Sequence, residues 1–232
     1  VQNYTNLLIP EAARLTRHIK PGLRLSHLHF GGGSPTILRA GDFDRLMQTL
    51  REHFPFTDDA EIAIEIDPRR LTEGRIAAYG KNGVNRASLG VQDFDRTVME
   101  SVNRAQPFHL SYEAVSMLRD YGIDRINMDL MYGLPHQTTD TMRDTIDSAA
   151  SLKPDRIALF GYAHVPWMKK HMRLIDETTL PDSAERYDLF ETAATALEKT
   201  YGYLPVGIDH FVKPGDSMAI ALQNKALRRN FQ

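Results

Sequence analysis

The fold is indicated by one stretch of sequence, Leu23-Arg24-Leu25-Ser26-His27-Leu28-His29-Phe30-Gly31-Gly32-Gly33-Ser34-Pro35-Thr36. Apolar and polar residues alternate from Leu23 to Phe30, as in a β-strand, and the three glycines then end the strand. A helix is predicted next, over residues 43–54, because five apolar residues recur there every three or four positions. A strand followed by a helix is the unit of a parallel sheet, since parallel neighbours need a crossover connection.

The same order recurs along the rest of the chain. Further strands are predicted over 61–67, 85–92, 125–132, 156–163 and, more weakly, 203–211. Further helices are predicted over 71–79, 110–121, 138–152 and 181–201. The chain opens on a helix predicted over 3–19, with no strand before it, and on Val1 rather than Met. We therefore expect an α/β fold of one domain, a partial, open parallel (β/α)6 barrel that lacks its first strand, in a fragment of a longer protein.

The composition narrows the range of partners. The chain has 232 residues, a net charge of -2, 42% hydrophobic and 25% charged residues. This near-neutral balance gives no reason to expect nucleic acid or an anionic membrane as a partner. There is also no apolar run of the length, about 18 residues, that spans a bilayer. Because the sequence contains no cysteine, disulfides and thiolate metal sites within the chain are excluded.

Polar residues and glycines gather where the predicted strands end. Ligands bind at these carboxyl ends in parallel barrels and open sheets, so we expect the functional site there. The residues concerned are Gly31 to Thr36, Glu65, Asp67, Gln92, Asp93, Asp129, Ala163 and His164. The opposite ends carry Arg86, Arg125 and Arg156, which we interpret as solvated residues at strand starts.

The three consecutive glycines allow two interpretations. They form either a tight turn, since glycine tolerates positive φ, or a stretch of bare backbone that contacts a ligand directly. One glycine would suffice for a turn, whereas three remove the side chains from about 10 Å of extended backbone. A phosphate-binding loop is not supported, because the Gly-x-x-x-x-Gly-Lys spacing is absent.

Carboxylates at the strand ends suggest polar ligand contacts. Glu65 and Asp67 point to the same side of one predicted strand, where Glu65 can accept hydrogen bonds from a ligand amine or hydroxyl. A hydrolase that uses the two as an acid and base is an alternative, but side-by-side carboxylates are poorly placed to flank a bond. Asp129 interrupts an apolar strand, so we expect it to have a partner, either a ligand or a structural arginine.

Cationic and histidine side chains leave further alternatives open. Arg104 follows a predicted loop over 95–103. Its guanidinium is either solvated or binds a ligand carboxylate through two parallel hydrogen bonds. His27 and His29 share a strand face, and His164 and His210 lie at other strand ends. Three histidines can bind zinc, but no paired histidine motif is present, so we predict no metal site formed by these residues.

Taken together, these motifs resemble the oxygen-independent coproporphyrinogen III oxidases, a family of radical S-adenosylmethionine (SAM) enzymes of haem biosynthesis. The resemblance covers nearly the whole chain. It rests on residues His29–Thr36, Glu61–Pro68, Gly90–Phe94, Val102–Arg104, Asp129–Pro135, Tyr162–Trp167 and Gly207–Phe211. The last two of these segments distinguish the oxidases from paralogues that share the glycine run.

The resemblance implies a fold, a reaction and cofactors. Residues 1–232 would form a barrel of the radical SAM type, without its first strand and cluster loop. The enzyme would oxidatively decarboxylate two propionates of coproporphyrinogen III to vinyl groups, giving protoporphyrinogen IX. It would use two S-adenosyl-L-methionine molecules and a 4Fe–4S cluster held by a Cys-x-x-x-Cys-x-x-Cys loop. Because those cysteines are absent, we expect the chain as given to be inactive.

The resemblance also assigns site residues, all of them to S-adenosylmethionine. Gly32, Gly33 and Ser34 would offer backbone groups to the methionine part, and Arg104 would pair with a methionine carboxylate. Glu65 would bind an amine or ribose group. The remaining polar and backbone contacts would come from Gln92, Asp129 and Ala163.

The partners implied are coproporphyrinogen III and a reducing electron donor, in a monomeric cytoplasmic protein. The substrate carries four propionates, so we expect cations at its entrance. The candidates are Lys169, Lys170, His171, Arg228 and Arg229. A non-catalytic haem- or cofactor-binding barrel related to the oxidase is the alternative.

Overall fold

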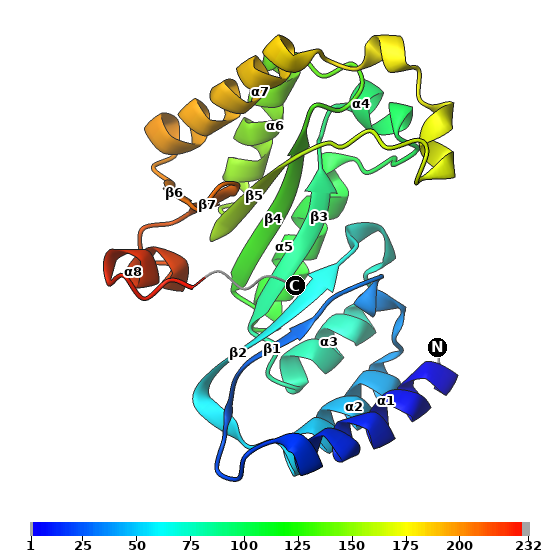
Figure 1. The fold of residues 1–232 in the computed structure, drawn as a ribbon, viewed down its shortest axis with the longest axis vertical. Helices are drawn as coiled ribbons and strands as arrows, with labels where there is room; N and C mark the ends of the chain where they lie inside the picture. Colours follow the sequence, from blue (N-terminus) through cyan, green and yellow to red (C-terminus); the bar gives the residue numbers. More distant parts are fainter. Residues whose placement is uncertain (1, 229–232) are drawn as a thin grey trace. The chain divides into compact units, whose positions relative to one another are not determined.

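The computed structural model describes residues 2–228, and their side chains from Tyr4 onward. Figure 1 draws the chain's helices and strands in colours that follow the sequence. The chain divides into two compact units. The first holds the residues up to Leu89 together with Glu113–Ile126, and the second holds Gly90–Tyr112 and the residues from Asn127 onward. Strand β3 (Arg86–Gln92), helix α5 (Phe108–Asp120) and strand β4 (Arg125–Tyr132) each cross the boundary.

The first unit is built from strand–helix repeats, as predicted. Its elements are α1 (Gln2–Leu15), β1 (Leu25–Phe30), α2 (Ala40–His53), β2 (Phe56–Ile66), α3 (Glu73–Lys81) and the start of β3. Strand β2 pairs in parallel with both β1 and β3. Helix α2 packs against α1 and α3, and Figure 1 shows the three helices together. Short 3₁₀ turns follow the strands, at Pro35–Ile37 and Pro68–Arg70.

The core of the first unit follows the predicted helical face. Phe43, Leu46 and Met47 of α2 are buried, as the apolar period of 43–54 requires. The Phe43 ring contacts the ring of Tyr79 edge-on, with 4.8 Å between centroids. Ile64 of β2 is also fully buried. Burying an aliphatic, Met or Phe side chain stabilises the fold by about 1.5–3 kcal/mol. The cluster therefore fixes α2 against α3 and, through the Phe30 ring 5.0 Å from that of Phe43, against the end of β1.

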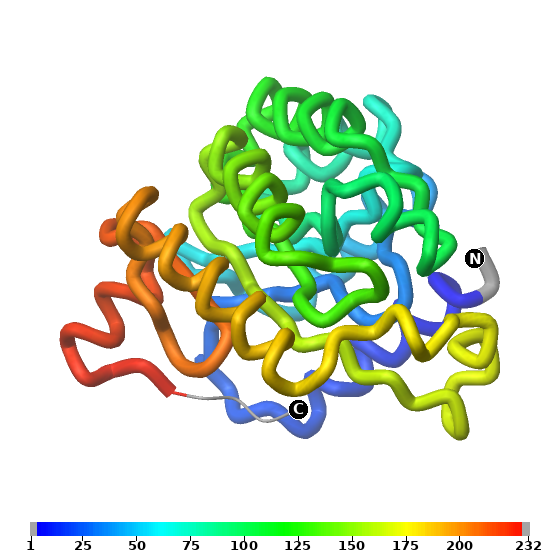
Figure 2. Tube along the Cα trace, turned by 90° about the horizontal axis from the view of Figure 1, so that it is seen from above, coloured from blue at the N-terminus to red at the C-terminus, as the bar shows by residue number. Residues whose placement is uncertain are grey.

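The second unit contains a parallel pair of strands and a hairpin. Strand β4 pairs in parallel with β5 (Arg156–Gly161). The helices are α4 (Arg96–Ser101), α6 (Thr139–Ser151), α7 (Ser183–Thr195) with a π-helical last turn (Ala196–Thr200), and α8 (Ser217–Gln223). Figure 2 shows α6 and α7 side by side. Two 3₁₀ segments, Lys170–Leu174 and Glu177–Thr179, lie between β5 and α7.

The weaker strand predicted over 203–211 was wrong as a single parallel strand. It forms two short strands, β6 (Leu204–Val206) and β7 (His210–Val212), which pair antiparallel with each other. Strand β7 also pairs antiparallel with β5. The chain reverses at Gly207, whose φ of +72° suits glycine. Residues 207–209 form a short turn between β6 and β7, whereas two parallel strands would need a much longer crossover connection.

The loop predicted over 95–103 was also wrong, because residues Arg96–Ser101 form helix α4. Its N-cap is Asp95, whose carboxylate accepts a hydrogen bond of 2.9 Å from the Val98 amide. Such a cap satisfies one of the free amides that begin a helix.

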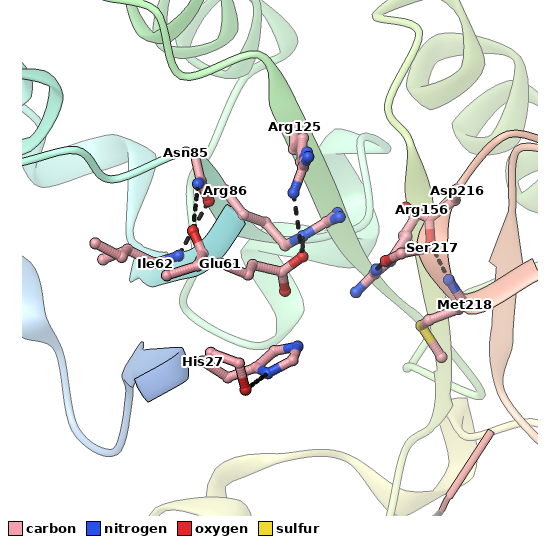
Figure 3. Close-up of polar contacts among 12 residues, drawn as sticks. His27, Glu61, Ile62, Asn85, Arg86, Arg125, Arg156, Asp216, Ser217 and Met218 are labelled. Carbon is pink, nitrogen blue, oxygen red and sulfur yellow. Dashed lines mark hydrogen bonds and ion pairs between the residues drawn. The ribbon is translucent and has the colours of Figure 1, made fainter. Parts of the chain in front are cut away.

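The arginines at the strand starts are not simply solvated. Arg86 is only 3% exposed, and its Nε lies 3.0 Å from the Glu61 carboxylate, which also lies 3.6 Å from Arg125 Nη1 (Figure 3). Arg156 is buried as well, and its Nε donates to Asp216 Oδ1 at 2.8 Å. The solvated interpretation was therefore wrong for Arg86 and Arg156, since a paired carboxylate offsets the cost of burying each guanidinium.

No helix in the described part of the chain combines the length and the apolar character that crossing a bilayer requires.

Candidate functional site

The glycine run after β1 needs its glycines for two different reasons. Gly32 and Gly33 have φ values of +74° and +82°, which side chains rarely tolerate. The space where their side chains would stand is open. At Gly31, by contrast, a Cβ would lie 2.6 Å from His29 Nε2 and 2.7 Å from Glu65 Oε1. The run is therefore both a turn and a bare, accessible backbone beside a carboxylate.

Glu65 lies against this run, near the end of β2. Its Oε2 accepts a hydrogen bond of 3.3 Å from the Gly32 amide, and its Oε1 lies 3.3 Å from His29 Nε2. The side chain is 44% exposed. A carboxylate has about four acceptor sites, so Glu65 retains capacity for a ligand amine or hydroxyl. The structure thus brings together two residues that the sequence assigned to one site, Gly32 and Glu65.

Ser34 and Asp67 each begin a 3₁₀ turn beyond a strand. The Ser34 hydroxyl lies 2.9 Å from that of Thr36, and the Ser34 carbonyl accepts a bond from Ile37. Asp67 accepts bonds from Arg69 Nε and Nη2 at 2.9 and 2.8 Å and also caps its turn. Because Asp67 is bound to Arg69 in this way, it makes a poor acid or base, which argues against the hydrolase alternative.

In the second unit, Arg104 is placed by the end of helix α4. Asn103 has a φ of +54°, and its amide bonds to the Glu100 carbonyl, while the Arg104 amide bonds to the Met99 carbonyl at 2.8 Å. These two bonds form a Schellman motif, in which a left-handed residue reverses the chain after the helix. Asparagine adopts this conformation more readily than most residues. The direction of Arg104 is thus fixed by the residue before it.

Gly90 of β3 lies next to two of the predicted ligand-binding side chains, those of Gln92 and Arg104. The carbonyl oxygen of Gly90 accepts a bond of 2.6 Å from Arg104 Nη2 and a longer one, 3.3 Å, from Gln106 Nε2. A Cβ at Gly90 would lie 3.3 Å from both Arg104 Nη2 and Gln92 Nε2. Gln92 itself has a φ of +74°, an unusual value that often marks functional positions. Gln92 and Arg104 are thus brought together over one glycine.

A buried carboxylate next to Gln92 organises the loops around it. Asp93 is fully buried and accepts hydrogen bonds from Gln137 Nε2 at 2.5 Å, Thr145 Oγ1 at 2.7 Å and the Asp95 amide at 2.6 Å. Burial raises the pKa of Asp93, and these hydrogen bonds oppose the rise. Gln137 also accepts a bond from the Leu134 amide, just after β4, and donates one to the Met131 carbonyl within β4. The sequence placed Asp93 at a strand end but did not reveal this network.

The ends of β4 and β5 carry the remaining predicted residues. Asp129 is half-buried rather than fully buried, and it lies opposite Ala158 in the β4–β5 register. Tyr132 pairs with Gly161, so both strands end together, and Ala163 is exposed two residues beyond.

Three of the four histidines at strand positions or strand ends lie beside an acid, whereas His27 Nδ1 lies 3.0 Å from the Ser26 hydroxyl. The pairs are His29 with Glu65, His164 with Glu177 and His210 with Asp209. Within residues 2–228, no group of three or more histidine or carboxylate side chains is arranged to hold a metal ion. Of the proposed substrate cations, Lys169, Lys170, His171 and Arg228 are exposed, and Arg229 lies outside the described residues.

Comparison with known proteins identifies the family and the relatives that the chain resembles. The family model described as "Radical SAM superfamily" matches residues 2–149. The anaerobic coproporphyrinogen III oxidase 1 of Cereibacter sphaeroides is 45% identical over 232 residues, which are 100% of this chain and 51% of that protein. The oxygen-independent coproporphyrinogen III oxidase of Bradyrhizobium diazoefficiens is 48% identical over 99% of this chain and 51% of its own length. The chain therefore spans about half the length of these relatives.

Solved structures show the same similarity at the level of the fold. The coproporphyrinogen III oxidase of Escherichia coli, described as a radical SAM enzyme, superposes with a TM-score of 0.89 at 37% identity, covering 99% of this chain and 53% of that one. An archaeal Elp3 from Methanocaldococcus infernus, 16% identical with a TM-score of 0.56 over 78% of this chain and 48% of that one, shares the fold alone. The predicted α/β fold with an open, mostly parallel sheet of radical SAM type is thereby confirmed. The family model covers well over half of the residues, and the chain belongs to the radical SAM superfamily.

Proposed function

We propose that this chain is part of an oxygen-independent coproporphyrinogen III oxidase. This oxidoreductase of haem biosynthesis converts two propionates of coproporphyrinogen III to vinyl groups with loss of carbon dioxide. The observation that carries the proposal is the extent of the sequence similarity, since six coproporphyrinogen III oxidases match 99% to 100% of the chain at 43% to 48% identity. Solved structures outside this group, such as the archaeal Elp3, share 13% to 16% identity with the chain, and so support only its fold.

The residues present suit S-adenosylmethionine, of which we propose that two molecules bind. In the first unit, Gly32 and Gly33 offer backbone that no side chain shields, and Ser34 continues it. These three are proposed to contact the methionine part of a cofactor. The Glu65 carboxylate, exposed beside them, is proposed to accept a hydrogen bond from the amine or ribose.

In the second unit, Arg104 is proposed to pair with a methionine carboxylate. Its guanidinium is held by the Gly90 carbonyl and its backbone amide by the Met99 carbonyl at the end of α4, so little conformational entropy is lost on binding. Gln92, in its left-handed conformation next to Gly90, is proposed to bind a polar cofactor atom. Asp129 is proposed to do the same, and Ala163 is proposed to contribute a backbone contact.

The chain does not suit the iron–sulfur cluster. It contains no cysteine, and the described residues include no alternative group of metal ligands. A 4Fe–4S cluster, which requires thiolate ligands, therefore finds none among these 232 residues. We propose that cysteines outside this sequence hold it in the whole protein, and that the chain alone has no oxidase activity.

The proposed substrate is a tetrapyrrole with four carboxylates. Lys169, Lys170 and His171 are exposed in and beside the 3₁₀ segment after β5, and we propose that they attract these charges. A reducing electron donor, a monomeric state and a cytoplasmic location complete the proposal.

One observation favours a second candidate, a non-catalytic barrel that binds haem or another cofactor. The missing cysteines would be expected of such a relative. Haem titration of the chain distinguishes the two, because the oxidase proposal includes no haem ligand.

A chimera tests the proposed reaction. This chain would replace the matching half of the Escherichia coli oxidase, which supplies the remaining sequence. Anaerobic incubation with coproporphyrinogen III, S-adenosylmethionine and a reductant is then followed by chromatography of the porphyrins. We expect conversion to protoporphyrinogen IX, and loss of conversion when the chimera also carries Arg104→Ala. A folded chimera that binds S-adenosylmethionine without converting the tetrapyrrole would contradict the proposal.

A further inference from the structure

Arg186 occupies an unusual position in the second unit. It lies in the first turns of α7 and is half-buried. Its guanidinium carbon lies 5.6 Å from the centroid of the Tyr132 ring, in a cation–π contact at the end of β4. Its Nη1 donates a long hydrogen bond of 3.5 Å to the Gly133 carbonyl. The charged group therefore reaches from the helix to the carboxyl end of a strand.

Two glycines make room for this guanidinium. Gly133 has a φ of +85°, and a Cβ there would overlap Arg186 Nη1. Gly161 ends β5, and a Cβ there would lie 3.3 Å from Arg186 Nη2 and 3.0 Å from the Tyr132 hydroxyl. Because Tyr132 and Gly161 are paired neighbours, the guanidinium sits where β4 and β5 end together.

Arg186 has no carboxylate partner within the described part of the chain. The acids of its own helical turn are engaged elsewhere, since Asp182 accepts bonds from the Ala184 and Glu185 amides at 2.8 and 2.9 Å. Glu185 in return accepts a bond of 2.8 Å from the Asp182 amide, which completes a capping box. A half-buried arginine with one long hydrogen bond is unusual, because its planar fork carries five donors.

We propose that Arg186 binds a carboxylate of a ligand at the ends of β4 and β5. A planar guanidinium can bind a carboxylate through two parallel hydrogen bonds. The Tyr132 ring orients the Arg186 guanidinium, and Gly133 and Gly161 leave space for it at the strand ends. The inference rests on the proposed function, which offers two sources of this chemistry. One is the methionine carboxylate of S-adenosylmethionine, and the other is a propionate of the tetrapyrrole.

Titrations with matched ligands test the inference and distinguish the sources. The chain would be titrated with S-adenosylmethionine and its decarboxylated analogue, and with coproporphyrin III and its tetramethyl ester. We expect Arg186→Gln to weaken the binding of one acid ligand by about tenfold or more, as for a charged hydrogen bond. It would leave the binding of the matched ligand without a free carboxylate unaffected, so that the preference for the carboxylate disappears.

Three further variants would test whether Arg186 acts through its guanidinium. Arg186→Lys keeps the charge without the fork, so we expect it to recover only part of the affinity. Gly161→Ala crowds Nη2 without removing it, so we expect a smaller loss in the same ligand pair, and this variant serves if Arg186→Gln does not fold. Lys199→Gln, an exposed charge change in the π-helical turn after α7, should leave every affinity unchanged.

The outcomes are distinct. If Arg186→Gln keeps the wild-type thermal midpoint and binds both acid ligands within twofold of wild type, the inference is overturned. If the unmodified chain binds neither S-adenosylmethionine nor coproporphyrin III, the proposed function fails before any variant is compared.

Discussion

Alanine substitutions in the glycine run should change stability in a way that depends on position. At Gly32 the φ of +74° costs an L-residue about 1–2 kcal/mol, while the stiffer unfolded chain returns roughly 0.4–1 kcal/mol. The net loss for Gly32→Ala is therefore about 1 kcal/mol. Gly74, exposed in α3 with open space around it, is the matched control. Alanine there should add about 0.5–1 kcal/mol, because it favours the helix.

Urea unfolding followed by circular dichroism measures both changes in the free energy of unfolding. We expect opposite signs and a difference of about 1.5–2 kcal/mol between the two variants. Gly31→Ala adds a steric contrast, because its Cβ would meet the tips of His29 and Glu65. It should weaken S-adenosylmethionine binding more than it weakens folding, since those tips can move. Equal shifts of the same sign for Gly32→Ala and Gly74→Ala would refute the conformational argument.

Three further predictions concern charged groups. Arg104→Ala should weaken S-adenosylmethionine binding by roughly 1.5–3 kcal/mol in calorimetry, and an unchanged affinity would remove Arg104 from the site. Asp216→Ala leaves buried Arg156 without this carboxylate, so unfolding in urea should cost about 3–5 kcal/mol less. Adding Arg156→Met should restore much of that loss, whereas a single-variant loss below about 1 kcal/mol would contradict the pairing. Because burial raises the pKa of Asp93, the native state binds its proton more readily than the unfolded state does. The stability of the wild type relative to Asp93→Asn should therefore fall as pH rises from the ordinary pKa of 3.8 to the native value, and then level off; a rise over that interval would be inconsistent with a buried carboxylate.

Elements with a strong local period could be predicted from the sequence. Strand β4 has the predicted bounds, Arg125–Tyr132, because its alternation is regular and Gly133 follows it at once. Helix α4 was missed because six residues are too few to show a period, although Asp95 offered a capping signal. The hairpin of β6 and β7 was missed because its pairing with β5 depends on contacts that no local pattern encodes.

In the candidate site, too, some contacts could be predicted from the sequence and others could not. The proximity of Gly32 and Glu65 follows from strand order, since adjacent parallel strands end at the same edge. The burial of Arg156 depends on Asp216, 60 residues further along the chain, and was therefore hidden. Arg186 was equally hidden, because an arginine on a long helix normally belongs to its solvated face.

The central claim is that these residues bind S-adenosylmethionine, and calorimetric titration of the chain tests it most directly. The account predicts saturable binding by the wild-type chain and no measurable binding when Glu65→Gln and Arg104→Ala are combined. Haem, titrated in parallel, should show no stoichiometric binding. A folded wild-type chain that binds haem but not S-adenosylmethionine would contradict the account.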